Sequence, residues 1–417
     1  MQPQNPIAKL CLIANYPASC CGDAFYTAPF AVRLLRHPAD LFSEVHYVLP
    51  QSPTDDAIEI APEARLDDCP EKSVTLMPAP ANRFARWLRQ WPVLWKSIAA
   101  ADLVCTYIPD EIGFFTALIC ALQRKPLLLQ VIGNWGEAVQ FSRPADTARR
   151  LLVRIAGFME RFSVRSADLV FTQGRALFEK CVRLNPRATR SAIVASTISD
   201  EHFYLRAAAA THAPARLLSV SRLERGKGIH ILLEATRQLA ARGVPIELCC
   251  VGCGPERVAL ESMAAAYRLK VHFAGNVSFG ERLDALYRAA DIFILPTFHE
   301  GLPYVILEAM AQSIPIVTTT VGGIPHLLQN GVDAFLVAPG DSTALAQAIE
   351  RLIQNPAQAH KMAEAAFHKV KHYRLSVFSQ EHRELIEEAF GPIAGHPANQ
   401  ISAPFSEPAP VLGQVRS

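Results

Sequence analysis

Short apolar segments alternate with longer amphipathic segments along the whole chain. Near-continuous runs of aliphatic residues are typical of strands that are buried on both faces of a parallel sheet. They form two groups: 9–15, 44–50, 102–108, 126–133 and 168–173 in the first, and 216–222, 246–252, 271–275, 291–297 and 314–320 in the second. Because helical patterns separate these strands, each group predicts a doubly wound, Rossmann-like α/β domain.

The sequence between and after the two groups indicates the domain organisation. The segment RAAAATHAPAR (206–216) is rich in small residues and typical of a link. Near the C-terminus, RLSVFSQEHRELIEEAF (374–390) has the pattern of a helix, and prolines recur after it. We therefore expect an N-terminal domain over 1–205, a C-terminal domain over 206–373, a helix over 374–391 that crosses back to the N-terminal domain, and a disordered tail over 392–417.

One helix-to-strand joint occurs three times. In AAADLVCTY (99–107), RSADLVFTQ (165–173) and RAADIFILP (288–296), small residues end a helix, an aspartate follows, and an apolar strand begins. The three aspartates are Asp102, Asp168 and Asp291. Because the Asp side chain can hydrogen-bond to nearby backbone at a turn, we interpret all three as structural.

Composition narrows the class of protein. The 417 residues suffice for two or three domains, and 50% hydrophobic with 19% charged residues is a globular, enzyme-like balance. The net charge of +2 gives no reason to expect a nucleic-acid partner. No apolar stretch reaches the roughly 18 residues of a spanning helix, and the N-terminus lacks the pattern of a secretory signal. We expect a cytoplasmic protein.

The cysteines favour a reducing compartment. The chain has 10 cysteines, and the neighbours Cys20–Cys21 and Cys249–Cys250 are adjacent pairs that make poor disulfide frameworks. The single CxxC, Cys250–Cys253, has no second pair to complete a zinc site. We expect buried thiols and no metal site.

The segment SVSRLERGKGIHILLEA (219–235) combines cations with glycines between a strand and a helix. Arg222 and Lys227 share this loop with Gly226 and Gly228. Ligands of doubly wound folds bind outside the carboxyl ends of the strands, and the fork of Arg and the mobile ammonium of Lys suit phosphate oxygens. A phosphate or diphosphate site is one interpretation, and a solvated basic turn is the other.

A second glycine turn, CVGCGPERVALESMA (250–264), follows another predicted strand. Gly252, Gly254 and Pro255 precede the next helix, but the third glycine of a dinucleotide fingerprint is absent. The turn is a weak signal for a dinucleotide, yet it can bring backbone amides close to a ligand. Pro255 is typical of a first helical turn.

Two glutamates frame a third turn. In HEGLPYVILEAM (299–310), Glu300 lies in a loop after a strand, and Glu308 lies on the helix that begins near Pro303. The N-terminus of a helix carries partial positive charge and free amides that suit a diphosphate. Carboxylates beside it can accept hydrogen bonds from the hydroxyls of a sugar and a ribose. The alternative is a helix-terminal charge at Glu300 and a surface residue at Glu308.

Taken together, these segments resemble a known family. In order and spacing, residues 216–350 are similar to the C-terminal domain of the retaining GT-B glycosyltransferases of family 4, also called glycosyl transferases group 1. The matching segments are SRLERGKGI, VGCGPE, FAGNV, LYRAADIFILPTFHEGLPYVILEAMA, PIVTTTVGGIPHLL and DAFLVAPGD. The resemblance implies two Rossmann-like domains that face each other across a cleft.

The resemblance also implies a donor site. It assigns the diphosphate of a nucleotide sugar to Arg222 and Lys227, the hydroxyls of the donor sugar to Glu300, and the ribose to Glu308. The remaining expected donor-site residues are Gly301, Leu302 and Pro303 at the helix N-terminus, with Gly252, Gly254 and Gly22. Cations and helix amides would stabilise the leaving diphosphate in place of a metal, and the chain has no Asp-x-Asp motif.

The first half departs from the family. The family's glycine-rich loop after the first strand is reduced to Gly22 in PASCCGDAF, and the usual histidine is missing from QVIGNWGEAV (130–139). Asn134 or Glu137 can substitute for it, and a structural role for the loop is the alternative. Asp110, after the strand in CTYIPD, is a further catalytic candidate beside Glu300 and Asn134. His326 also stands where the family usually has Glu.

One basic segment carries several tryptophans. In NRFARWLRQWPVLWK (82–96), Trp87, Trp91 and Trp95 recur every four residues and share a helix face, with Pro92 interrupting or starting the helix. A basic helix with tryptophans can lie on an anionic membrane surface. The alternative is a packed helix with its aromatic side chains inward.

The sequence thus predicts a retaining, metal-independent hexosyltransferase of bacterial surface polysaccharide or glycoconjugate synthesis. A nucleotide-diphosphate sugar is the expected co-substrate, with no other cofactor, and a glycan or lipid-linked sugar is the expected acceptor. Peripheral contact with the inner face of the membrane is assigned to 82–96. The alternatives are a nucleotide-sugar epimerase on the same fold and a degenerate nucleotide-binding scaffold without turnover.

Overall fold

The chain forms two compact units in a computed structural model. The structure describes residues 6–21, 24–52, 65–67, 71–78, 83–136, 147–192, 198–208, 212–277, 279–301 and 303–394. Unit 1 comprises Met1–Ser196 together with Ser376–Ser417, and unit 2 comprises Thr197–Leu375. The division lies before the predicted boundary at 205, because residues 204–206 form hydrogen bonds within unit 2. The Tyr204 amide, for example, donates to the Ala311 carbonyl at 2.9 Å.

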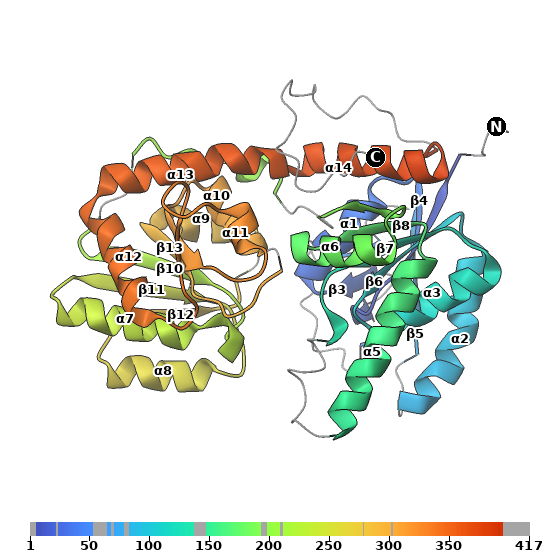
Figure 1. The fold of residues 1–417 in the computed structure, drawn as a ribbon, viewed down its shortest axis with the longest axis horizontal. Helices are drawn as coiled ribbons and strands as arrows, with labels where there is room; N and C mark the ends of the chain where they lie inside the picture. The colour runs from blue at the N-terminus through green and yellow to red at the C-terminus, as the bar shows by residue number, and fades with distance from the viewer. Residues whose placement is uncertain are drawn as a thin grey trace. The chain divides into compact units, whose positions relative to one another are not determined.

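Unit 1 contains a parallel sheet of order β5-β4-β1-β6-β7-β8-β9 (Figure 1). Its strands are β1 (Lys9–Ile13), β4 (Glu44–Pro50), β5 (Lys72–Met77), β6 (Leu103–Ile108), β7 (Leu127–Val131), β8 (Leu169–Thr172) and β9 (Thr189–Ser191). A separate antiparallel hairpin joins β2 (Ala18–Cys21) and β3 (Ala24–Thr27). Its helices are α1 (Pro29–Ala39), α2 (Arg83–Ala99), α3 (Glu111–Gln123), α5 (Thr147–Ser166), α6 (Arg175–Leu184) and α14 (Leu375–Phe390).

The strands of unit 1 are buried on both faces. Along β1, Leu10 and Leu12 belong to one apolar cluster, which also contains Ile386 of α14. Cys11 and Ile13 point to the opposite face and belong to a second cluster, built with α2, α3 and α5. Because successive side chains of a strand alternate between faces, this division shows that helices cover both sides of the sheet, as the continuous apolar pattern predicted.

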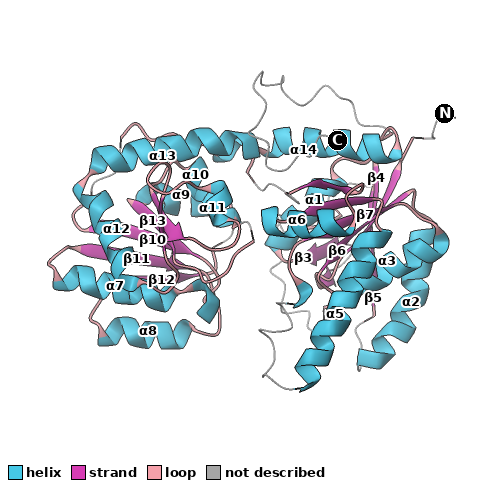
Figure 2. Cartoon of the chain, in the orientation of Figure 1, coloured by secondary structure: helices cyan, strands magenta, loops and turns pink. Residues whose placement is uncertain are grey.

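Unit 2 contains a second parallel sheet, of order β12-β11-β10-β13-β14-β15 (Figure 2). Its strands are β10 (Ala215–Val220), β11 (Ile246–Val251), β12 (Val271–Gly275), β13 (Ile292–Leu295), β14 (Ile316–Thr319) and β15 (Phe335–Val337). Its helices are α7 (Ile229–Ala241), α8 (Arg257–Ala266), α9 (Glu281–Ala289), α10 (Tyr304–Ala311), α11 (Ile324–Leu327), α12 (Ser342–Gln354) and α13 (Pro356–Val370).

Both faces of this sheet are covered as well. Ile292 and Ile294 of β13 pack with α7, α8 and α12, whereas the Phe293 ring between them contacts the Tyr287 ring of α9, with centroids 5.5 Å apart. The predicted fold class, two doubly wound parallel-sheet domains, is therefore confirmed.

The strand order of each unit reverses direction at one point. In unit 2 the chain moves outward from β10 through β11 to β12, then returns to the other side of β10 with β13. In unit 1 the same reversal lies between β1 and β6. The loops that leave adjacent strands at such a point diverge, and doubly wound folds bind ligands there, outside the carboxyl ends of the strands.

The repeated aspartates lie at the amino ends of the strands, opposite to the carboxyl ends where such folds bind ligands. The carboxylate of Asp102 accepts from the Lys9 amide at 2.9 Å, and that of Asp168 accepts from the Leu127 amide at 2.9 Å. The Asp102 and Asp168 amides donate back to the carbonyls of the same two residues, each at 3.1 Å. Each aspartate therefore starts its own strand and binds the first residues of the neighbouring one, in agreement with the structural interpretation.

Several details differ from the sequence predictions. Strands β2, β3, β5, β9 and β15 were not predicted. Helix α2 continues through Pro92, which neither starts nor ends it. Cys11, Cys105, Cys120, Cys181 and Cys250 are buried thiols. Of the predicted tail over 392–417, residues 395–417 lie outside the described part of the chain.

Candidate functional site

The loop after β10 is the first part of the candidate site. It contains a short 3₁₀ turn, Arg225–Lys227, and ends at Gly228, whose φ of 72° is left-handed and precedes the first residue of α7. A Cβ atom on Gly228 would lie 2.0 Å from the Pro296 carbonyl oxygen, so only glycine fits there. The Gly226 carbonyl accepts from the Phe298 amide at 2.9 Å. The loops after β10 and β13 are thus bound to each other.

This contact brings Lys227 and Glu300 together. The Lys227 Nζ donates to the Glu300 Oε1 at 2.5 Å, across 73 positions of sequence. The two side chains are 21% and 13% exposed, so the pair is largely shielded from water but not sealed from it. A charged pair of this kind can exchange a partner for a ligand, because Lys can move its point charge to a phosphate and Glu can accept from a hydroxyl.

The loop after β14 supports the backbone of Glu300. Gly322 has a φ of 54°, and a Cβ atom on it would lie 1.7 Å from the Glu300 carbonyl oxygen. The next amide, of Gly323, donates to the Gly301 carbonyl at 3.0 Å. The Gly322–Gly323 turn therefore allows two backbones to approach and holds the loop that carries Glu300.

The loop after β11 packs against the loop after β10. A Cβ atom on Gly252, whose φ is 129°, would lie 1.9 Å from the Ser221 carbonyl oxygen, and one on Gly254 would lie 2.3 Å from the Leu223 carbonyl oxygen. The Leu223 amide donates to the Cys253 carbonyl at 2.9 Å. The two predicted glycines thus let the loop after β11 pack on the loop that carries Arg222 and Lys227.

Arg222 differs from Lys227 in exposure. Its side chain is 77% exposed and forms an ion pair with Glu224 of the same loop. An exposed pair of this kind contributes little to stability, so the Arg222 guanidinium can reorient toward an anion at low cost.

Glu308 is buried rather than on the surface. It lies on α10 with 6% exposure, and its Oε2 accepts from the Tyr287 hydroxyl of α9 at 3.0 Å. The surface-residue alternative for Glu308 is therefore wrong. Pro303 precedes the first residue of α10 as predicted, Gly301 is exposed, and Leu302 lies outside the described residues. The sequence analysis did not single out Tyr287, although the segment LYRAAD was part of the family pattern.

In unit 1, Asp110 lies directly after β6, at the point where the strand order reverses. Its Oδ1 accepts from the Gly113 amide at 2.6 Å and so caps α3. Burial raises the pKa of Asp110 to about 7, with a further increase from Glu111, against the lowering effect of the backbone hydrogen bonds. A carboxyl group with this pKa can exchange a proton near neutral pH.

Asn134 lies after the neighbouring strand β7. Its Oδ1 accepts from the Gly136 amide at 3.1 Å and from Lys180 Nζ at 3.4 Å, and Lys180 also pairs with the buried Glu160 at 2.5 Å. The side-chain oxygen of Asn134 thus helps to shape its own loop. Gly22 and Glu137 lie outside the described residues.

Three further observations bear on the predictions from the sequence. His326 is exposed on α11. Within the described ranges, no cluster of three or more His, Cys, Asp or Glu side chains could hold a metal ion. Within the same ranges, no helix has the length and hydropathy needed to cross a membrane.

Comparison with known proteins shows what this arrangement is similar to. Residues 204–369 match the family described as glycosyl transferases group 1. The matched residues include the loops after β10, β11, β13 and β14.

Two of the curated relatives are named for the biosynthesis of a polysaccharide. The chain is 32% identical over 215 residues to the amylovoran biosynthesis glycosyltransferase AmsK of Erwinia amylovora, covering 49% of this chain and 52% of that protein. It is 32% identical over 195 residues to the putative colanic acid biosynthesis glycosyltransferase WcaL of Escherichia coli, covering 44% and 48%. The chain thus spans about half the length of these relatives.

Solved structures extend the likeness to nearly the whole chain. The sucrose-phosphate synthase of Thermosynechococcus elongatus superposes with a TM-score of 0.69 at 20% identity, covering 92% of this chain and 99% of that one. Anabaena Alr3699/HepE, solved with UDP and glucose, gives a TM-score of 0.69 at 17% identity, covering 91% and 99%. The chain therefore has the GT-B fold.

Proposed function

We propose that this protein is a glycosyltransferase that moves a hexosyl group from a nucleotide-diphosphate sugar to a glycan or lipid-linked acceptor. The observation that carries the proposal is the Lys227–Glu300 pair, which lies where the strand order of unit 2 reverses, within the segment that matches the glycosyl transferases group 1. The reaction proceeds with retention and without a metal, in the synthesis of a bacterial surface polysaccharide or glycoconjugate.

The charges of unit 2 suit a leaving diphosphate. Lys227 turns from Glu300 to the phosphates, Arg222 leaves its exposed pair with Glu224, and the N-terminus of α10 adds backbone amides. Cations that are already in place when negative charge develops stabilise the transition state without reorganisation. Glu300, released from Lys227, accepts hydrogen bonds from the donor sugar.

The buried pair on α9 and α10 suits the nucleoside. The Tyr287 hydroxyl holds one carboxylate oxygen of Glu308, which fixes the orientation of that carboxylate. Glu308 then accepts from the ribose hydroxyls. The remaining donor-site residues of this proposal are Gly252, Gly254, Gly301, Leu302, Pro303 and Gly22.

Unit 1 supplies the acceptor side. Asp110 has a pKa of about 7, which suits a group that takes the proton of an acceptor hydroxyl. Asn134 acts beside it as a hydrogen-bonding group that Lys180 positions. We assign the protein to the cytoplasm, with peripheral contact between 82–96 and the membrane.

Ligand-dependent melting tests the donor site. UDP, GDP, ADP and their hexose conjugates are added to the wild type and to an Arg222→Ala/Lys227→Ala variant, with UDP first because HepE was solved with UDP-glucose. A ligand that binds only the folded state raises the melting temperature. We expect one nucleotide to raise the melting temperature of the wild type and not that of the variant; no shift with any nucleotide at millimolar concentration contradicts the proposal.

Product analysis tests the reaction. Hexose transfer to an added glycan or lipid-linked acceptor, with release of nucleoside diphosphate over many turnovers, is the expected result. Isomerised nucleotide sugar without acceptor identifies an epimerase, and binding without turnover identifies a scaffold.

A further inference from the structure

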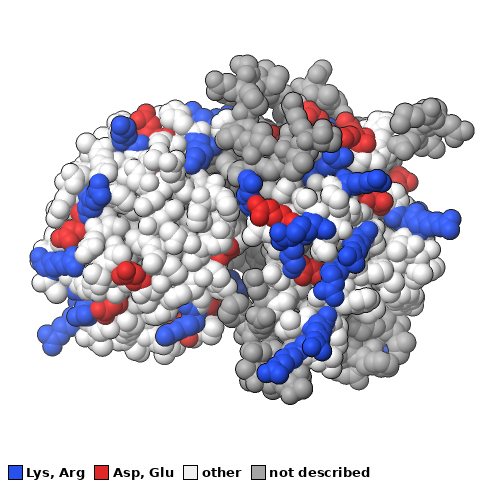
Figure 3. Space-filling model, viewed as in Figure 1, with Lys and Arg blue, Asp and Glu red and all other residues white. Residues whose placement is uncertain are grey.

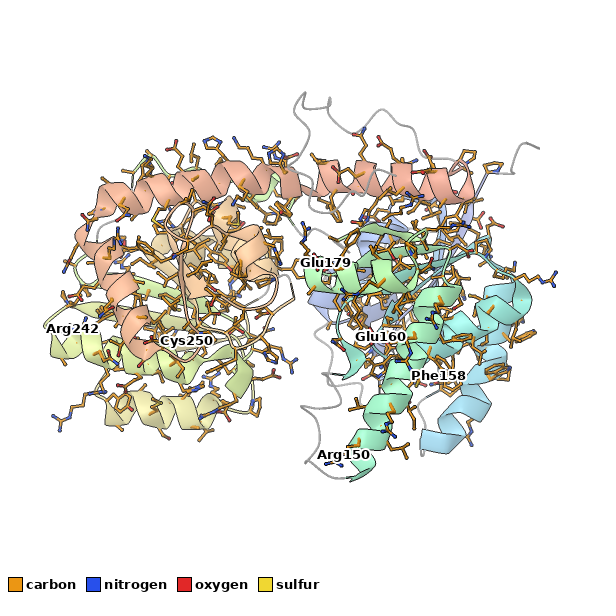
Figure 4. The ribbon with its side chains drawn as sticks, in the orientation of Figure 1. Arg150, Phe158, Glu160, Glu179, Arg242 and Cys250 are labelled. Carbon is orange, nitrogen blue, oxygen red and sulfur yellow. The ribbon has the colours of Figure 1, made fainter. Side chains whose placement is uncertain are left out.

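The outer surface of α5 exposes apolar side chains that a water-facing helix usually keeps buried. Leu151, Ile155 and Phe158 are 59%, 45% and 58% exposed. They stand four and three positions apart, so they form one strip along the helix. Figure 4 shows α5 with Phe158 and Glu160 labelled along its length and Arg150 near its start.

Arginines border this apolar strip. Arg150, Arg154, Arg161 and Arg165 are all exposed on α5, and Figure 3 shows Lys and Arg side chains gathered over this part of unit 1. The one acidic residue of α5, Glu160, is buried and pairs with Lys180 at 2.5 Å. The described exposed face of α5 therefore combines apolar contact area with positive charge.

Aromatic rings connect this strip to two more helices, where Trp91 and Phe114 also pack against the buried cluster of unit 1. Phe158 contacts Phe162 on α5 at 6.5 Å between centroids, and Phe162 contacts Phe114 of α3 at 5.6 Å. The line continues through Phe115 to Trp91 of α2 at 6.3 Å and from Trp91 to Trp95 at 6.2 Å. Its two ends are exposed, Phe158 at 58% and Trp95 at 41%.

We propose that this surface of α2, α3 and α5 docks the protein on an anionic lipid bilayer. The apolar strip and Trp95 enter the boundary between headgroups and acyl chains, where Trp is favoured. The arginines reach lipid phosphates with their guanidinium groups while their stems lie along apolar surface. The inference deepens the membrane contact proposed for 82–96, because it adds α5 to that contact and does not require turnover.

Charge argues against a second copy of the chain as the occupant. A symmetric dimer brings the same patch of two subunits together, so the arginines of one α5 would face those of the other without acidic partners from the described face. An anionic bilayer supplies an apolar interior for the strip and complementary charge for the arginines that border it.

Vesicle sedimentation of the full chain tests the proposal. Vesicles of phosphatidylcholine alone are compared with vesicles that contain about one-third phosphatidylglycerol, at low and at high salt. The wild type should bind the anionic vesicles, more weakly at high salt. Leu151→Gln/Ile155→Gln/Phe158→Gln should reduce that binding on the order of tenfold or more, and Arg150→Gln/Arg154→Gln/Arg161→Gln should remove the preference for anionic lipid.

The matched control replaces exposed apolar residues elsewhere. Val258 and Val332 are 74% and 47% exposed on unit 2, and Val258→Gln/Val332→Gln should bind vesicles as the wild type does. Trp95→Phe should lose a large part of the vesicle-induced blue shift of tryptophan fluorescence. All variants are first shown to retain the wild-type melting temperature and its shift with nucleotide, which separates this test from that of the donor site.

Three results would overturn the proposal. One is wild-type vesicle binding by the α5 triple variant. Another is the absence of binding by the wild type to anionic vesicles at low salt. The third is a wild-type dimer in light scattering that the α5 variant converts to a monomer, which would assign the surface to self-association.

Discussion

The ammonium of Lys227 and the carboxylate of Glu300 lie 2.5 Å apart although 73 positions separate them in sequence. They leave two neighbouring strands, β10 and β13, on the two sides of the point where the strand order reverses. A ligand that draws Lys227 away removes the hydrogen-bond partner of Glu300. In the proposed donor site, a nucleotide sugar would therefore have to engage both side chains.

Substitutions of Lys227 and of Glu300 should have different effects on binding and on catalysis. Lys227→Ala should weaken binding of the nucleoside diphosphate at least tenfold, because it removes a charge-assisted contact. Glu300→Gln should preserve nucleotide binding within about threefold and lower kcat by a factor on the order of 10²–10³. Calorimetric titration and initial rates measure the two effects.

Arg225 provides the control for Lys227. It lies in the same 3₁₀ turn, is 75% exposed, and has only a 3.9 Å ion pair to Glu256. Arg225→Ala should change nucleotide affinity by about twofold or less. An equal loss in both alanine variants would mean that general positive charge, and not Lys227, attracts the nucleotide.

Gly322 should tolerate no side chain. In Gly322→Ala the new methyl group would collide with the Glu300 carbonyl, and the φ of 54° would be strained as well. We expect a loss of about 2–3 kcal/mol in the free energy of unfolding and reduced transfer.

The variant Gly331→Ala measures the effect of backbone strain in the absence of a steric collision. Gly331 has a φ of 78°, but a Cβ atom on it would meet nothing within 4 Å. This control should lose only about 1 kcal/mol in urea unfolding, and equal losses at the two positions would argue against a tight approach of Gly322 to Glu300.

Asp110 should make stability depend on pH in a particular direction. Its pKa is raised to about 7 by burial, so between about pH 4 and pH 7 the folded chain holds a proton that the unfolded chain has released. Stability from this group is therefore present at low pH and is lost as the pH rises toward 7.

Asp110→Asn should remove this dependence while the amide oxygen still caps α3. Relative to the wild type, the variant should gain about 2 kcal/mol in the free energy of unfolding between pH 5 and pH 8, since one pKa unit corresponds to about 1.4 kcal/mol and Asp110 is partly exposed. Urea unfolding of both proteins across this range measures the difference, and parallel pH profiles would contradict the assigned pKa.

Asp291 should contribute to stability without a role in chemistry. Its carboxylate accepts from the Arg216 amide at 2.7 Å and from His212 at 2.7 Å. Asp291→Ala leaves a strand amide without its acceptor and should cost about 1–3 kcal/mol. The folded variant should keep the wild-type nucleotide affinity, and a selective loss of that affinity would indicate a functional role.

Much of the fold was predictable because the sequence of a buried parallel strand is a local run of apolar residues. The strand of Ile292–Leu295 is such a run. The strand of Lys72–Met77 was not predicted, because it lies at the edge of its sheet and polar residues interrupt its sequence, KSVTLM. Edge strands face fewer apolar neighbours, so their sequences carry a weaker pattern.

The site was predictable only in part. Glycines and charges at strand ends indicated the loops of Lys227 and Glu300, because carboxyl ends of parallel strands share one edge of a sheet. The Tyr287–Glu308 hydrogen bond joins two different helices, and the contacts of Asn134 with Gly136 and Lys180 depend on tertiary packing. No local pattern specifies such pairs.

The place of α14 has a consequence for biosynthesis. Unit 2 is one continuous stretch, whereas unit 1 needs Ile386 from the far end of the chain for its apolar cluster. During translation, all residues of unit 2 leave the ribosome before unit 1 can acquire its last helix. Of the two units, the one that is synthesised earlier is therefore completed later, and a ribosome that stops within unit 2 yields a nascent chain whose unit 1 sheet still lacks part of its cover.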